Sequence, residues 1–179
     1  VKNGTLEESV LDQRLDELLR VIFATHQATV DGKGTTFNKE AHHKLARKAA
    51  EESIVLLKNE EQILPLKQGT KVAVIGDFAK TPRYQGAGSS LVNPAMPPES
   101  ILEEIKDSGL TMTAYEQGYI RNRKPNAKLV KAAVDAAKNA DVVLFFGGLD
   151  EISESEGLDR THMYMPVAQD ELINELTTV

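Results

Sequence analysis

The apolar residues recur with a helical period in the first third of the chain. Thr5 and Glu8 have the spacing of a capping box, and the apolar stripe that follows them predicts a helix over about residues 6–24. A Thr- and Gly-rich stretch without periodicity, residues 27–38, predicts a connection, and a second helix is expected over residues 39–52. The stripe of the first helix consists of Leu11, Leu15, Leu18, Leu19 and Ile22.

The pattern changes to that of buried strands from Lys71 onward. Val72–Ile75 and Val142–Phe146 are continuous apolar runs followed by glycine, as expected for parallel strands buried on both faces. Thr111–Tyr115 is a third strand-like segment, and amphipathic helices are predicted between the strands and after residue 166. Because strands alternate with helices, we expect an α/β fold with a mainly parallel sheet flanked by helices, an α/β sandwich.

The composition is that of a folded domain: 41% of the residues are hydrophobic and 27% are charged. The net charge of -6 comes from interspersed residues of both signs, which argues against nucleic acid or an anionic membrane as a partner. No apolar run reaches the roughly 20 residues that a membrane-spanning helix needs. The absence of cysteine excludes disulfides, thiolate metal sites and a cysteine nucleophile.

Five carboxylates crowd into the loop that follows the last predicted strand. Crowded carboxylates raise one another's pKa, which is one way to keep a carboxylic acid protonated for general-acid catalysis. On the residues alone, a solvated charged loop is the simpler interpretation. A calcium or magnesium site is a third, although the spacing differs from that of an EF-hand. The five acids are Asp150, Glu151, Glu154, Glu156 and Asp159, and Arg160 follows them.

The loop after the first strand, GDFAKTPRYQGAGSS, is the second candidate site. Neither GxGxxG nor GxxxxGK[ST] occurs in it, so a nucleotide site has weak support, and Gly86 and Gly88 could serve the loop conformation only. Tyr84 could stack on a sugar ring, and Arg83 could hold a hydroxyl or a carboxylate. Both loops follow parallel strands, so we expect them at the same edge of the sheet.

Five segments in a fixed order carry a family resemblance. They are ARKAAEESIVLLKNEEQILPL, KVAVIGDFA, RYQGAGSS, PPESILEEI and DVVLFFGGLDEISESEGLDRTHMYMPVAQDELI. Together they resemble glycoside hydrolase family 3, in particular its β-glucosidase and β-xylosidase branch, from about residue 40 onward. The resemblance implies a retaining hydrolase of β-linked glucosides or xylosides that uses no cofactor and no metal.

The resemblance also implies roles for single residues. The acid/base glutamate in the family's SEGxDR type of loop matches Glu156 best, and Glu154 is the alternative. Asp159 and Arg160 are expected to support the loop. Arg83 and Tyr84 are expected to bind substrate near the outer sugar subsite.

The family's aspartate nucleophile lies on a barrel domain, and its motif does not occur in this sequence. We therefore expect residues 1–38 to be the end of a first domain and a linker, and residues 39–179 to be the α/β sandwich domain, truncated at its C-terminus. The expected partners are a β-linked oligosaccharide or glycoside and the barrel of the same chain, toward which the stripe of the first helix would face. The isolated fragment should be inactive. The competing hypothesis is a non-catalytic α/β module that binds a carbohydrate or a cation.

Overall fold

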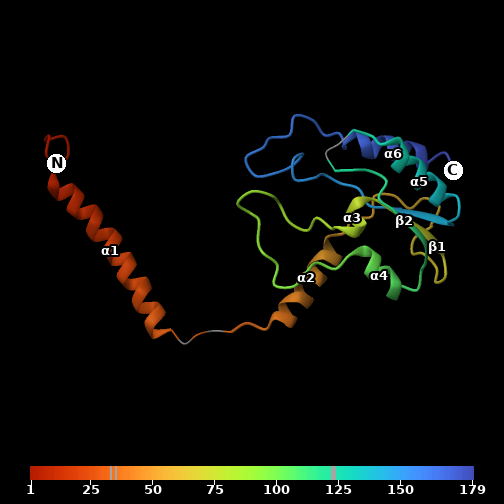
Figure 1. Cartoon of the computed structure of the whole chain (residues 1–179). Coiled ribbons are helices and arrows are strands. Elements are labelled where there is room, and N and C mark those ends of the chain that lie inside the picture. Colours follow the sequence, from red (N-terminus) through yellow and green to blue (C-terminus); the bar gives the residue numbers. More distant parts are fainter. Residues whose placement is uncertain (33, 35, 122–123) are drawn as a thin grey trace. The chain divides into compact units, whose positions relative to one another are not determined.

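A computed structural model describes residues 1–32, 34, 36–121 and 124–179 of the chain (Figure 1). These residues form two compact units, Val1–Lys58 and Asn59–Val179. The domain boundary expected after residue 38 stays a prediction. Among the described residues, no helix is both long enough and apolar enough to cross a lipid bilayer.

The first helix of the Val1–Lys58 unit, α1 (Glu8–Asp31), extends beyond the predicted end at residue 24. Its polar C-terminal part hydrogen-bonds within the helix: the Thr29 hydroxyl donates to the Thr25 carbonyl at 2.9 Å, and the Gln27 amide donates to Asp31 at 2.8 Å. A side-chain pair four residues apart, such as Gln27 and Asp31, supports a helix that has no apolar periodicity. The start of the predicted connection is therefore helical.

The two helices of this unit begin differently. The predicted capping box of Thr5 and Glu8 is wrong, because Glu7 is the N-cap residue of α1 and no side chain caps this end. The second helix, α2 (Lys39–Ser53), confirms the predicted range, and the Asn38 side chain accepts a hydrogen bond from the Ala41 N–H at 3.0 Å. Neither helix has a buried residue, so the apolar stripe of α1 is exposed in the described structure of this unit.

The Asn59–Val179 unit contains a sheet of three parallel strands in the order β2-β1-β3. The strands are β1 (Lys71–Ile75), β2 (Thr111–Glu116) and β3 (Val142–Phe145), close to the predicted ranges. The third strand ends one residue earlier than predicted, although the Phe146 N–H still donates to the Ile75 carbonyl at 2.7 Å. The predicted mainly parallel sheet is confirmed.

Helices cover both faces of this sheet. On one face, Val72 and Val74 of β1 pack with Ile105 of α4 (Ile101–Asp107). On the other face, Ile75 packs with residues of α5 (Ala127–Ala137) and α6 (Val167–Leu176). The central strand is therefore apolar on both sides, which explains why its sequence is a continuous apolar run.

A short helix, α3 (Asp77–Lys80), follows β1 and was not predicted. Four residues are too few to show a helical period, and the sequence analysis assigned them to a loop. Phe78 and Ala79 are nevertheless buried. This turn therefore anchors the start of the Gly-rich loop in the core.

The strand order places a topological switch point between β1 and β3. The chain passes from β1 to β2 through α4 on one face and from β2 to β3 through α5 on the other face. The connections that follow β1 and β3 thus leave adjacent strands in different directions, and this is where α/β sheets bind ligands. Figure 1 shows the loops at 77–98 and 149–166 on the same side of the sheet, as predicted.

The ends of β1 and β3 approach each other closely at Gly76. This glycine has a φ of +127°, and a Cβ atom on it would lie 2.1 Å from the Phe146 carbonyl oxygen. Side chains with a Cβ atom rarely adopt such a backbone conformation, and the short distance leaves no room for one. Gly76 is therefore required for the two loops to leave the sheet side by side.

We expect Gly76→Ala to lower the free energy of unfolding by roughly 3 kcal/mol or more, because backbone strain and displacement of Phe146 act together. The matched control is Gly69→Ala, where φ is +80° and nothing lies within 4 Å of the added Cβ atom. There the backbone strain alone should cost about 1 kcal/mol. Equilibrium urea unfolding measures both losses, and equal losses would contradict the close approach.

Candidate functional site

The two loops at the switch point meet at Glu156. The Ser89 N–H donates to Glu156 Oε2 at 2.7 Å, and the Glu156 N–H donates to the Ala87 carbonyl at 3.2 Å. Gly88 lies between these partners with a φ of +88°, and a Cβ atom on it would be 3.0 Å from the Glu156 Cβ atom. The Gly-rich loop therefore forms the surface on which the predicted acid/base residue lies.

Arg83 points into the acidic loop. Its Nη1 atom donates to the Leu149 carbonyl at 3.0 Å. Its Nη2 atom donates to the Glu154 carbonyl at 2.8 Å and to Glu154 Oε2 at 2.7 Å. The Arg83 side chain is only 14% exposed, and its Nε atom lies 4.0 Å from Glu151 Oε1. These contacts join Arg83 to the same loop as Glu156.

A second arginine, Arg121, was missed by the sequence analysis. Its Nε atom lies 2.5 Å from Asp77 Oδ2, its Nη1 atom lies 3.4 Å from Glu151 Oε1, and its guanidinium group stacks over the Phe78 ring at 4.1 Å. It also donates to the Thr81 carbonyl. The one available signal was its position shortly after β2, whose carboxyl end lies at the same sheet edge.

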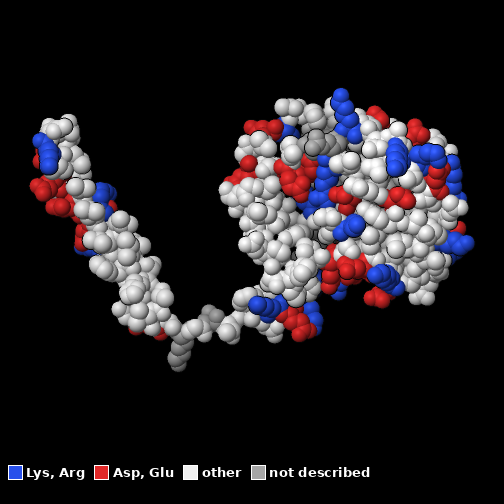
Figure 2. Space-filling model, in the orientation of Figure 1, with Lys and Arg blue, Asp and Glu red and all other residues white. Residues whose placement is uncertain are grey.

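The two arginines change the electrostatics expected for the acidic loop. Mutual repulsion among five carboxylates was predicted, but Glu151 and Glu154 have guanidinium partners. Acidic and basic side chains also lie next to one another on the visible face of the Asn59–Val179 unit (Figure 2). The loop is thus held by opposite charges, which does not favour an additional cation. Within the described residues, no group of three or more His, Asp and Glu side chains is placed to hold a metal ion.

Asp150 shapes the start of the acidic loop. It is 2% exposed, and its Oδ1 atom accepts hydrogen bonds from the N–H groups of Ile152 at 3.1 Å and Ser153 at 2.7 Å. The Glu154 N–H donates to the Asp150 carbonyl at 3.0 Å. The carboxylate of Asp150 therefore forms a turn, as aspartates commonly do with the backbone two and three residues ahead.

The end of the loop has weaker contacts. Arg160 donates to the Tyr164 carbonyl at 3.2 Å, which joins two parts of the loop. Asp159 and Glu156 are exposed. The supporting roles of Asp159 and Arg160 stay predictions.

A cavity of about 610 Å³ lies between the loops that follow β1 and β3. Tyr84, Arg83 and Gly86 line it from one loop, and Gly148 and Glu154 line it from the other. Tyr84 is 53% exposed. The structure thus brings Tyr84 and Arg83 to one wall, and Glu154 rather than Glu156 lines this cavity.

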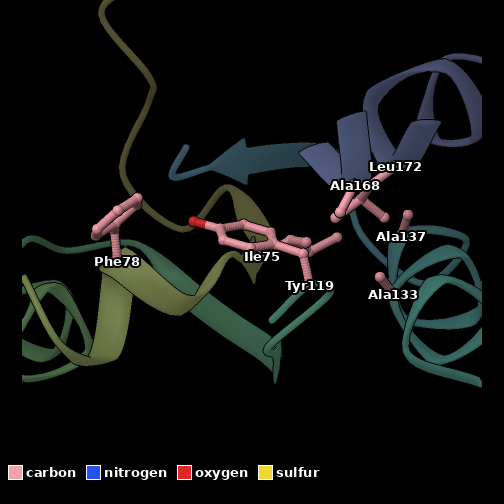
Figure 3. Packing of buried hydrophobic residues seen from close by; sticks show 7 residues of the cluster. All are labelled: Ile75, Phe78, Tyr119, Ala133, Ala137, Ala168 and Leu172. Carbon is pink, nitrogen blue, oxygen red and sulfur yellow. The ribbon is translucent and has the colours of Figure 1, made fainter. Parts of the chain in front are cut away.

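Buried polar side chains hold the base of the acidic loop. The Tyr119 hydroxyl donates to the Phe146 carbonyl at 2.8 Å, and the buried Gln169 amide bonds to both the N–H and the carbonyl of Gly148, each at 2.8 Å. In Figure 3 the Tyr119 ring lies between Phe78 on one side and Leu172 on the other. Burial is the main cause that raises the pKa of Tyr119 to about 12.

These features define an α/β domain that carries an acidic loop at the carboxyl edge of a parallel sheet. The sequence pattern described as Glycosyl hydrolase family 3 C-terminal domain matches residues 54–179. The chain belongs to this family, which confirms the resemblance seen in its motifs.

Relatives support this assignment along the whole chain. The chain is 43% identical to the thermostable β-glucosidase B of Acetivibrio thermocellus, with 100% of this chain and 24% of that protein covered. It is 38% identical to the exo-α-(1→6)-L-arabinopyranosidase of Bifidobacterium breve, with 98% and 24% covered. The crystal structure of a family 3 β-glucosidase from Bifidobacterium adolescentis matches with a TM-score of 0.78 and 38% identity, over 99% of this chain and 26% of that one. The chain spans about a quarter of the length of these proteins.

The buried hydroxyl of Tyr119 predicts a loss of stability at high pH. The pKa of this group is raised from 10 to about 12 in the folded state, so its stabilising effect is complete below pH 10 and is lost as the pH rises to 12. The loss should reach about 2–3 kcal/mol.

Urea unfolding between pH 9 and pH 12 tests this prediction, with Tyr119→Phe as the control, because the other tyrosines and the lysines titrate in both proteins. The wild-type stability should fall more steeply than that of the variant. Parallel pH profiles would show that Tyr119 is not the cause.

Proposed function

We propose that this chain is part of a retaining glycoside hydrolase and that its acidic loop supplies the acid/base residue, Glu156. The nucleophile would be an aspartate of a barrel domain in the same protein, and no cofactor takes part. Family membership and the β-glucosidases among the relatives support the reaction type. Within this chain, the assignment rests on the hydrogen bond between the Ser89 N–H in the Gly-rich loop and the Glu156 carboxylate at the switch point.

The proposed mechanism needs two carboxyl groups about 5–5.5 Å apart. Glu156 would protonate the glycosidic oxygen while the aspartate attacks the anomeric carbon and the leaving alcohol departs. The deprotonated Glu156 would then take a proton from the water that attacks the anomeric carbon of the glycosyl-enzyme, and the bond to the aspartate would break to release the sugar. This chain supplies one of the two groups, so the isolated chain should be inactive.

The hydrogen bonds favour Glu156 over Glu154 as the acid. Protonating Glu154 would weaken its charge-assisted bond to Arg83, which is 2.7 Å long. The Glu156 carboxyl group can instead keep accepting the Ser89 N–H on Oε2 while Oε1 carries the proton. Glu154 remains the alternative because it lines the cavity that holds Tyr84.

The proposed substrates are β-linked glucosides or xylosides. Tyr84 is half-exposed in the cavity wall, where its ring could stack on a sugar, and Arg83 borders the same space. The relatives include both a β-glucosidase and an arabinopyranosidase, so a panel of aryl glycosides decides the sugar. Binding of glycosides without turnover in the full-length protein would favour the non-catalytic module instead.

We expect Glu156→Gln in the full-length enzyme to slow the hydrolysis of aryl glycosides with poor leaving groups by about 10²–10⁴-fold. Activated phenolates leave without a proton, so the first step with such substrates should be affected much less. Azide should partly restore turnover of the activated substrates, because a small anion can attack the glycosyl-enzyme without a base. Steady-state kinetics over a series of phenols measures both effects.

Glu154→Gln is the matched control for this test. It removes the same charge from the same loop and should show neither the leaving-group dependence nor the azide rescue. If Glu154→Gln shows both effects while Glu156→Gln stays near wild type, the acid/base residue is Glu154.

A further inference from the structure

The Arg83 guanidinium group spans the first part of the acidic loop. Through two different nitrogen atoms it binds the carbonyl of Leu149, at the start of the loop, and the carbonyl of Glu154. The turn formed by Asp150 lies between these two carbonyls. Arg83 therefore joins the two ends of this turn, and Glu156 lies only two residues after Glu154.

A second contact between the same two loops lies next to the first. The Glu156 N–H reaches the Ala87 carbonyl, and the Glu156 carboxylate accepts the Ser89 N–H. Arg83 precedes Ala87 by four residues in the Gly-rich loop. The acidic loop is thus attached to the Gly-rich loop at two successive places, one on each side of Ser155.

From this geometry we propose that Arg83 is a positioning residue that fixes the Glu156 carboxyl group by fixing the backbone from Leu149 to Glu154. This inference rests on the proposed function only in treating Glu156 as the acid/base residue. It differs from the expectation that Arg83 contacts substrate, because three of its hydrogen bonds go to the protein.

The chemistry of the guanidinium group suits this role. It is planar and presents donors in a fixed fork, so it can join two carbonyl oxygens and a carboxylate at the same time. A lysine ammonium group at this position could keep the charge pair with Glu154, but it is a point charge and could not span both carbonyls. The Arg83 side chain is 14% exposed and the Glu154 side chain is 48% exposed, so salt screens their ion pair only in part.

A chain of ion pairs holds Arg83 in turn. Glu151 lies within 4.0 Å of Arg83 and 3.4 Å of Arg121, and Arg121 pairs with Asp77 in α3. The connections that follow β1, β2 and β3 are therefore joined through alternating charges. A displacement of about 1 Å in a catalytic group can lower the rate about 10²-fold. Contacts of Arg83 that hold the acidic loop in place therefore affect the rate directly.

The test uses Arg83→Gln and Arg83→Lys in the full-length enzyme, with Lys80→Gln as the control. Lys80 is an exposed cation three residues earlier, so its variant makes the same charge change as Arg83→Gln without touching the acidic loop. With poor leaving groups, Arg83→Gln should lower kcat by about 10- to 100-fold with a small change in KM. Arg83→Lys should recover part of this loss and Lys80→Gln should match wild type.

Hydrogen exchange of the same proteins measures the loop without reference to activity. The amides of residues 152–158 should lose protection in Arg83→Gln, partly in Arg83→Lys, and not in Lys80→Gln. The proposal is overturned if Arg83→Gln keeps wild-type protection and kcat, or if Arg83→Lys restores both completely, since charge alone would then be enough. If Arg83→Gln does not fold, the comparison of protection and kcat between Arg83→Lys and wild type tests the proposal alone.

The two proposals can fail separately. Loss of loop protection in Arg83→Gln, together with a Glu156→Gln enzyme that behaves like wild type, would support Arg83 as the residue that holds the loop. It would contradict Glu156 as the acid/base residue. Unchanged protection and kcat in the Arg83 variants, with the expected kinetics of Glu156→Gln, would contradict only the positioning role of Arg83.

Discussion

The close approach of the backbone at the ends of β1 and β3 is the constraint on which the candidate site depends. Gly76 has no Cβ atom that would meet the Phe146 carbonyl, and that carbonyl accepts the Tyr119 hydroxyl at 2.8 Å. The two strands can therefore end side by side at the switch point of the sheet. The Gly-rich loop and the acidic loop leave from these ends, and their contacts at Glu156 follow from this placement.

Opposite charges then determine the form of the acidic loop. Arg83 and Arg121 come from the connections after β1 and β2, and both reach acids that follow β3. The arginine side chains are 14% and 19% exposed, and their guanidinium groups hold the carboxylates through donors of fixed geometry. As a result, Glu151 and Glu154 are engaged in the protein, whereas Glu156 has one backbone N–H on its carboxylate and remains exposed.

The sequence allowed the sheet and most helices to be predicted, because burial on both faces gives a strand like Val72–Ile75 a continuous apolar run. It could not show α3, whose four residues are too few to reveal a helical period, or the helical extension of α1 through polar residues such as Gln27. Arg121 was missed because its partners lie in the connections after β1 and β3, which meet the connection after β2 only in the fold. Arg83 was found by its chemistry, but its partners Leu149 and Glu154 are set by tertiary structure.

The central claim is that Glu156 lies at the scissile bond. A crystal structure of the full-length protein with an uncleaved β-glycoside analogue tests it most directly. The account predicts a Glu156 carboxyl oxygen within hydrogen-bonding distance of the glycosidic oxygen, and a barrel aspartate about 5–5.5 Å from the Glu156 carboxyl group on the other side of the anomeric carbon. A structure in which Glu154 takes that position, with Glu156 directed away from the sugar, would contradict it.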